Sequence, residues 1–506
     1  MNFVKKLLIT GVTVFLIVCV SIGQNLKQIT IDQDISGVQP MTGIVLWPTN
    51  SKINTDVISL EYSYMSYAEV VVAKDTYDWI VVEELLDEIA SRNHQAVLRF
   101  RFSYPGKTTT VPQYIKDLSD YEETQGISEG NTTWFPDWTH EELQRCILDF
   151  YEKFAANYDQ DPRLAFVQTG FGLWAEYHIY DGPFVLGETF PSMEYQEEFF
   201  NKMASVFVST TWSISIDAAG AAYSPFETKS ELKDINFGLF DDSFMHKDHA
   251  NYNESSWNFF DRNRYQWAPA GGEFSYYSTY DQQSVLIPDT GAYGESFESA
   301  VERFHMSYIL GNDQTQYQSI ERIAEASRYM GYKFKINSFK SGEGHSVVEV
   351  ENVGVAPFYS DAFVTVNGVR ASESLKLLLP GHTIVCNVAA GSNDPVLTIE
   401  SDQILETQTI SYYGTENTPY AYEPSEVLGV NELLDSNYSI SMDSGRIKLT
   451  AKQGFFKEVY VYTLHGKIVF KENEIESKSF FSFKLNSPEG LCILMTNLGN
   501  MKLYTN

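Results

Sequence analysis

Eight short runs rich in β-branched and aromatic residues recur between residues 43 and 310, and segments of helical periodicity separate them. The runs cover residues 43–47, 59–65, 95–102, 164–172, 212–217, 235–243, 269–275 and 306–310. Regular alternation of strand and helix with eight strands is what a closed parallel barrel requires. We therefore predict an α/β fold, a (β/α)8 TIM-type barrel over residues 30–331. A doubly wound open sheet is the alternative, but no glycine-rich phosphate loop follows the first run.

Two of the intervening segments have clear amphipathic helical periodicity. Residues 78–93 place four apolar side chains on one side, namely Ile80, Leu85, Ile89 and Ala90. Residues 140–158 repeat apolar side chains at helical spacing, namely Leu143, Cys146, Ile147, Phe150 and Phe154. We expect both segments to pack these faces against the barrel.

The pattern changes after Tyr332, where apolar and polar residues alternate in short runs between turn residues. This pattern predicts a β-sandwich over residues 332–413. Residues 414–427 contain Pro, Gly, Asn and Glu with little periodicity, so we predict a linker there. Further strand-like runs over residues 428–506 predict a second, smaller β-domain at the C-terminus.

The first 24 residues have the pattern of a signal peptide. Lys5 and Lys6 precede an apolar run at 7–20, and small or polar residues close the segment. This run is shorter than the roughly 20 residues that span a bilayer, which disfavours a membrane anchor. We therefore expect an exported protein, extracellular or at the outer cell surface, with the periplasm as a further possibility and no transmembrane segment.

The formal net charge of −31 is spread without a compensating basic stripe. Nucleic acid and anionic membrane surfaces are therefore poor candidates for partners. Aromatic residues make up 14% of the chain, which suits either sugar-stacking surfaces or a large core. The spacing of His246 and His249 could serve a metal ion, but a solvated loop is the better interpretation, so we predict neither a metal nor another cofactor.

In a barrel the reacting groups come from the C-terminal ends of the strands and the loops that follow them, which we call the mouth. Two carboxylates stand out there: Glu176 after the fourth run and Glu273 in the seventh. Glycosidic cleavage needs one carboxyl group to protonate the leaving oxygen and a second to attack the sugar or activate water. Candidate substrate-binding residues at the same end are Trp47, Tyr64, Arg99, Arg101, Trp174, His178, Asp217, Asp241 and Asp242.

The two glutamates have a catalytic and a structural interpretation. As a catalytic acid, Glu176 should have a raised pKa because Trp174 and Tyr177 make its setting partly apolar, whereas Glu273, beside two glycines, should stay ionised. In the structural interpretation both are buried carboxylates that bind nearby cationic side chains and hold loops together.

Seven segments, taken in order, resemble the family called domain of unknown function 4832, whose members are predicted relatives of clan A glycoside hydrolases. The segments are residues 77–100, 135–138, 161–178, 240–244, 269–275, 305–310 and 351–359. The resemblance covers about residues 40–410 and implies a barrel fused to a β-sandwich. Clan A enzymes take their two carboxylates from strands four and seven, which points to Glu176 and Glu273. Ala175 stands where these enzymes usually have Asn, so a common contact to the sugar 2-hydroxyl is missing.

The C-terminal segment resembles the sorting domain of the type IX secretion system of Bacteroidetes. Residues 461–470 match its strand-turn-strand pattern and residues 490–506 its closing pattern, while residues 437–443 replace the usual opening Tyr-Pro-Asn-Pro. The resemblance implies the secretion machinery as a partner; a plain structural β-module is the alternative. Together these features predict an exported carbohydrate-active enzyme, a glycoside hydrolase acting on a poly- or oligosaccharide. A non-catalytic glycan-binding or cell-surface protein on the same barrel is the second hypothesis.

Overall fold

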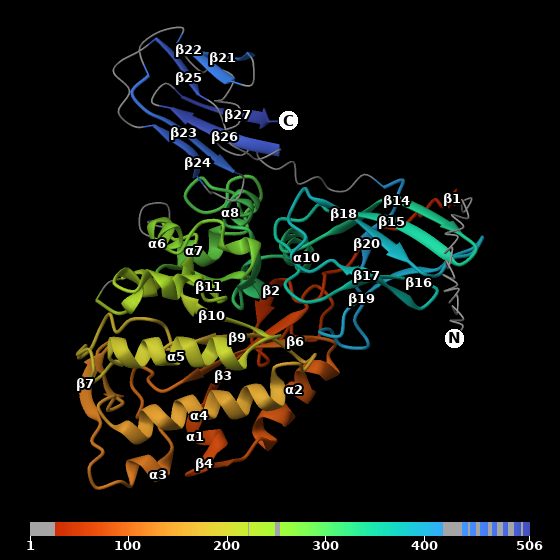
Figure 1. Cartoon of the computed structure of the whole chain (residues 1–506). Helices are drawn as coiled ribbons and strands as arrows, with labels where there is room; N and C mark the ends of the chain where they lie inside the picture. The colour runs from red at the N-terminus through yellow and green to blue at the C-terminus, as the bar shows by residue number, and fades with distance from the viewer. Residues whose placement is uncertain are drawn as a thin grey trace, which may run out of the picture.

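A computed structural model describes residues 26–220, 222–247 and 253–417 continuously, and the strands between 438 and 505 with gaps. The expected signal peptide, residues 1–24, lies outside the described residues, as do most of the expected linker, residues 428–437, and His249. Figure 1 shows a barrel with helices around it, a β-sandwich at one end and the C-terminal strands as a further group.

Eight parallel strands close into a barrel, which confirms the predicted fold class and excludes the open sheet. Each predicted run overlaps one of these strands. They are β2 (Gly43–Leu46), β3 (Leu60–Ser66), β6 (Gln95–Arg101), β9 (Leu164–Thr169), β10 (Thr211–Ser215), β11 (Gly238–Phe244), β12 (Ala270–Phe274) and β13 (Met306–Leu310). The barrel closes where β13 pairs with β2, in a register that places Ile309 beside Ile44.

Helices cover the outside of the barrel wall (Figure 1). The longer ones are α2 (Ile80–Ser91), α4 (Glu141–Tyr158), α5 (Met193–Val206), α8 (Phe297–Phe304) and α10 (Ile320–Tyr329). The apolar face predicted for α4 is buried as expected. The face predicted for α2 is confirmed only in part: Ile89 is buried as predicted, but the other buried residues are Val82 and Leu86, and Ile80 is 62% exposed. Ile80 is the first residue of this helix, and the buried stripe follows the i, i+4, i+7 spacing that begins two residues later.

Residues 334–413 form two mainly antiparallel sheets around a shared apolar core, with β20 as a parallel strand in the first. One sheet contains β14 (Phe334–Gly342), β15 (His345–Asn352) and β18 (Thr383–Val388), with the short strands β1 (Lys27–Gln28) and β20 (Tyr412–Tyr413) paired to β14. The other contains β17 (Val369–Ser374), β16 (Phe363–Val366) and β19 (Leu397–Glu400). Buried residues alternate with partly exposed ones along β15, as the sequence pattern predicted.

The sandwich is attached to the end of the barrel opposite the mouth. Gln408 Nε2 donates a hydrogen bond to the carbonyl of Asn93, just before β6, at 3.1 Å. Tyr359 OH donates to the carbonyl of Tyr265, before β12, at 2.7 Å. Because these barrel residues precede their strands, the sandwich covers the N-terminal end and leaves the mouth on the other side.

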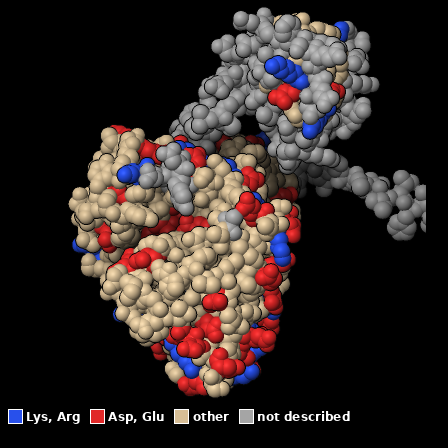
Figure 2. Space-filling view, turned by 90° about the vertical axis from the view of Figure 1, so that its left-hand side faces the viewer, with Lys and Arg blue, Asp and Glu red and all other residues tan. Residues whose placement is uncertain are grey.

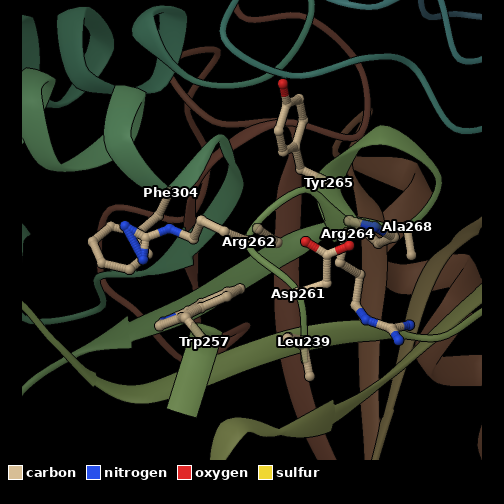
Figure 3. A pocket seen from close by; sticks show the side chains of 10 residues that line it. Leu239, Trp257, Asp261, Arg262, Arg264, Tyr265, Ala268 and Phe304 are labelled. Carbon is tan, nitrogen blue, oxygen red and sulfur yellow. The ribbon is translucent and has the colours of Figure 1, made fainter. Parts of the chain in front are cut away.

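A small void lies behind the barrel wall near this covered end (Figure 3). Its volume is about 10 Å³, room for a single water molecule. The guanidinium of Arg264 lies beside it and donates hydrogen bonds to the carbonyls of Phe260, Ile235 and Phe237 at 3.0 to 3.1 Å. Arg264 therefore provides hydrogen-bond donors for backbone carbonyl groups in this region. The void is a packing feature that is too small for a ligand.

The described C-terminal strands form two sheets of their own. One contains β21 (Tyr438–Asp443), β22 (Arg446–Ala451) and β25 (Phe480–Phe483); the other contains β24 (Ile468–Glu472), β23 (Val459–Thr463), β26 (Gly490–Thr496) and β27 (Gly499–Thr505). Leu449, Val461 and Leu494 belong to an apolar cluster distinct from the barrel and sandwich cores. Among the described helices of the whole chain, none combines the length and apolar character needed to cross a membrane.

Candidate active site

A buried arginine organises the inside of the barrel below the mouth. Arg99, in β6, is 2% exposed and donates two hydrogen bonds to Gln168 Oε1 of β9, at 2.9 Å from Nε and 2.6 Å from Nη2. Its Nη2 also lies 3.2 Å from Asp242 Oδ1 of β11. The guanidinium carbon is 4.1 Å from the centre of the Phe240 ring. Four barrel positions on three strands are thus fixed relative to one another by one cation.

The predicted acid, Glu176, is positioned by a tightly folded loop rather than by a strand. β9 ends at Thr169, and the loop turns back on itself so that Gly172 N donates to Glu176 O at 2.9 Å. Trp174 and Ala175 have left-handed backbone φ angles of 54° and 58°. Such conformations are unfavourable for residues other than glycine and tend to cluster at functional sites.

Three titratable side chains meet where this loop faces β10. His178 Nδ1 lies 2.5 Å from Asp217 Oδ2, and His178 Nε2 lies 3.4 Å from Glu176 Oε2. Ser215 Oγ lies within hydrogen-bonding distance of both Asp217 Oδ2, at 3.2 Å, and Asp242 Oδ2, at 2.9 Å. Polar contacts therefore connect Glu176 to Asp242 through His178 and Asp217.

Both predicted catalytic carboxyl groups have raised pKa values. For Glu176, burial is the largest cause, the negative charge of Asp242 adds to it, and Arg99 opposes it. Burial and the charge of Asp242 raise the pKa of Glu273 to about 8. This direction is opposite to the expectation that Glu273 stays ionised, because burial makes the solvation of its charge poor.

The imidazole of His178 also titrates away from its ordinary range. Burial lowers its pKa, but the hydrogen bond and charge of Asp217 outweigh burial, so the net shift is upward. Ligand atoms of Glu176, His178 and Asp217 lie within 4.8 Å of one another, so a single cation could reach all three. Carboxylate and imidazole groups are suitable ligands for a transition metal or Zn²⁺.

The predicted aromatic residues form two groups at the mouth. Trp47 packs edge-on against Tyr62, with ring centres 4.9 Å apart, and lies 5.3 Å from Tyr64. Trp174 stacks nearly parallel to Tyr180, with ring centres 5.9 Å apart. All three predicted aromatic residues are only partly buried. Tyr180 was not predicted, although its place two residues after His178 in the same loop was an available signal.

Two predicted residues have other surroundings. Asp241 points to the outer side of the wall, where it accepts hydrogen bonds from Asn253 Nδ2 at 2.8 Å and Trp257 Nε1 at 3.1 Å. Successive residues of a strand point to opposite faces, so Asp242 is brought into the site and Asp241 is not. Arg101 lies over the ring of Tyr104, 4.9 Å from its centre, at the edge of the site.

A cavity of about 540 Å³ opens beside His178 and Asp217, and we call it the groove. Its lining includes His178, Tyr180, Asp217, Tyr223, Phe259 and Tyr277. Figure 2 looks onto this side of the molecule and shows acidic side chains gathered along a hollow in it. A volume of this size is typical of small-molecule and oligosaccharide sites. Phe259 ends the helix α6 (Glu254–Phe259) and Tyr277 lies in the loop after β12, so strand-end positions alone could not indicate their role.

His246, once considered for a metal site, has a different partner. Its Nδ1 lies 2.8 Å from Asp281 Oδ2, and its ring stacks on Tyr277 with ring centres 4.6 Å apart. His249 lies outside the described residues, so the pair cannot be placed together.

Solved structures similar to this chain include several glycoside hydrolases. A trimodular GH5_4 subfamily endoglucanase matches with 10% identity and a TM-score of 0.35, covering 93% of this chain and 97% of its own. Endo-glycoceramidase II from Rhodococcus sp. matches with 9% identity and a TM-score of 0.32, covering 72% and 99%. The α-galactosidase TtGalA from Thermus thermophilus matches with 11% identity and a TM-score of 0.34, covering 60% and 64%.

These similarities are too weak to support an argument about the reaction. No family model matches the sequence. No curated protein matches it either. The barrel itself rests on the strand pairing described above.

Proposed function

We propose that this protein is an exported carbohydrate-active enzyme, a glycoside hydrolase that uses Glu176 and Glu273. The observation that carries the proposal is the pair of carboxyl groups on the mouth side of one barrel, both with raised pKa, of which Glu176 lies 3.4 Å from the groove residue His178. Groups with strongly shifted pKa values in a cleft are typical of acid and base catalysts. A poly- or oligosaccharide substrate fits the aromatic side chains around the groove.

The contacts suggest distinct roles for the carboxylates. Asp242 is bound to Arg99 and Ser215, so its charge is committed to holding the barrel interior. Glu176 suits the general acid because its raised pKa keeps a proton available near neutral pH. Among the described residues, no hydrogen bond contributes to the pKa shift of Glu273, so its carboxyl group suits a nucleophile or base once it loses its proton.

The test is turnover by Glu176→Gln and Glu273→Gln on the glycan that the wild-type protein hydrolyses in a panel of plant, algal and bacterial polysaccharides. Each change keeps the shape and removes the titrating group, so we expect kcat to fall by roughly 100-fold or more. Glu343→Gln, in an exposed turn of the sandwich, is the matched control. Normal turnover in both mouth variants would refute the assignment.

A non-catalytic glycan-binding protein is the second candidate, because Ala175 replaces the Asn that usually contacts the sugar. This candidate predicts binding to one of the polysaccharides without release of reducing ends. Affinity electrophoresis in gels containing each polysaccharide, combined with reducing-end assays, separates the two candidates.

We also propose a family, a signal peptide and a sorting domain for this chain from its sequence resemblances. Residues 40–410 would be a member of the domain of unknown function 4832 family, with a barrel over 30–331 and a sandwich over 332–413. Residues 1–24 would be removed on export, and residues 428–506 would be read by the type IX secretion machinery. Mass spectrometry of the secreted protein tests the first cleavage: a mature chain that still begins at Met1 would contradict export through a signal peptide.

A further inference from the structure

We propose that Tyr277, supported from behind by His246 and Asp281, is a platform on which the groove binds the ring of a neutral sugar. The inference rests on the proposed function for the class of ligand, but not for the catalytic roles. Tyr277 is 77% exposed and lines the groove. It was not among the candidate residues drawn from the sequence.

The support for this ring is a buried carboxylate with several donors. Asp281 is fully buried and accepts hydrogen bonds from Ser275 Oγ at 2.6 Å and from Ser278 Oγ at 2.7 Å, and it also accepts one from the Tyr293 hydroxyl. His246 Nδ1 approaches the same carboxylate at 2.8 Å. A buried charge held by this many partners fixes their orientation, because each alternative arrangement would leave a partner unpaired.

This network determines where Tyr277 lies. The His246 ring stacks against the Tyr277 ring at an interplanar angle of 29°, and Tyr277 N donates to Ser275 Oγ at 3.2 Å. Both the ring and the backbone of Tyr277 are therefore tied to groups that bind Asp281. An aromatic side chain held in place before binding loses little entropy when a sugar stacks on it.

The platform and a proposed catalytic carboxylate belong to one short segment. Glu273 is in β12, and Ser275 and Tyr277 follow it in the chain. Anchoring Ser275 to Asp281 fixes the path of the backbone between the carboxylate and the platform. A sugar stacked on Tyr277 would therefore be held at a constant position relative to Glu273.

The lining of the groove indicates which sugars fit. Tyr180 also lines the groove, is 53% exposed and stacks on Trp174, which gives a second aromatic surface. The described lining residues include Asp217 but neither Lys nor Arg. Carboxylated or sulfated glycans are normally bound through such cations. The groove thus favours neutral pyranose rings, whose C–H faces stack on aromatic rings, over uronic acids.

Binding is measured by calorimetry in the Glu176→Gln variant, where turnover does not interfere. The neutral probes are pentasaccharides of β-1,4-linked glucose, mannose or xylose, and the anionic probe is pentagalacturonate. We expect a neutral pentasaccharide to bind, Tyr277→Ala to weaken its binding about tenfold, and Tyr277→Trp to retain binding. Tyr280→Ala is the matched control, because Tyr280 is half exposed nearby but does not line the groove.

A second variant tests the support. Asp281→Asn should weaken binding of the same pentasaccharide and should change the imidazole NMR resonances of His246, which are assigned from their loss in His246→Gln. Unchanged affinity in Tyr277→Ala, unchanged His246 resonances in Asp281→Asn, or tighter binding of pentagalacturonate than of every neutral probe would each overturn the platform. If Glu176→Gln itself turns over glycans normally while Tyr277→Ala still loses affinity, the catalytic proposal fails and the platform stands.

Discussion

Replacing Gly172 by Ala should greatly reduce turnover at the mouth while leaving the barrel folded. A Cβ atom at this position would lie 1.9 Å from the carbonyl oxygen of His178 and 2.7 Å from its carbonyl carbon. Because real Cβ atoms essentially never approach a neighbour closer than 3.0 Å, the two backbone segments must separate by about 1 Å. The same segments are joined by hydrogen bonds from Gly172 to Glu176 and from Leu173 to His178, so the shift acts directly on both side chains.

A displacement of about 1 Å at a catalytic group can reduce turnover by roughly 100-fold. Overpacking of this kind costs about 1 to 3 kcal/mol of stability, which a barrel of this size should tolerate. The assay is kcat on the glycan found for the wild type, together with circular dichroism and a urea unfolding curve. Gly37→Ala is the control, since a Cβ there meets no atom within 4 Å. A folded Gly172→Ala protein with wild-type kcat would show that the loop geometry does not position Glu176 for catalysis.

Three further outcomes follow from other parts of the structure. Glu61 is fully buried and binds Arg92 at 2.7 and 2.6 Å and His94 at 2.7 Å. Glu61→Gln should therefore lower the free energy of unfolding in urea by about 3 kcal/mol, whereas Glu84→Gln, on the exposed side of α2, should change it little. Equal unfolding curves for the two variants would refute this. The carboxyl groups of Glu176 and Glu273 have raised pKa values in the fold, so between about pH 4.5 and 8 the folded state binds more protons than the unfolded state. Stability should therefore fall as the pH rises through this window. Glu176→Gln/Glu273→Gln should flatten the dependence of the melting temperature on pH, and a steeper decline would contradict the stated shifts. A chain that ends after residue 417 should melt cooperatively, because the C-terminal strands have their own apolar cluster. Aggregation of that shortened chain would show that the C-terminal strands complete the barrel core.

The sequence predicted the barrel well because hydrophobic periodicity reports local structure directly. All eight runs overlap barrel strands, and the buried face of α4 is as predicted. The face of α2 was misplaced because Ile80 is apolar but lies at the first, exposed position of the helix. The spacing of apolar residues does not define the residue at which a helix begins.

The site was only partly predictable, because it depends on loops and on contacts between distant segments. Position at strand ends suggested both Asp242, which the structure brings into the site, and its neighbour Asp241, which faces the other side of the wall. Gln168 was missed, although a polar side chain within an otherwise buried strand is a usable signal. The contribution of His246 to the support of Tyr277 could not have been predicted from the sequence, since His246 is 35 positions away from Asp281.

The ends of the unit formed by barrel and sandwich lie next to each other. Ile31 N donates to Thr415 Oγ1 at 3.0 Å, and Gly414 N donates to Gln33 O at 2.7 Å. Both chain segments enter and leave through the sandwich, on the side away from the mouth. Any tether joined to the chain before residue 26 or after residue 417 would therefore attach at the sandwich and leave the groove facing away from the point of attachment. The same adjacency means that a short peptide bridge between these ends, with new termini opened elsewhere on the surface, should give a circularly permuted protein with the same fold.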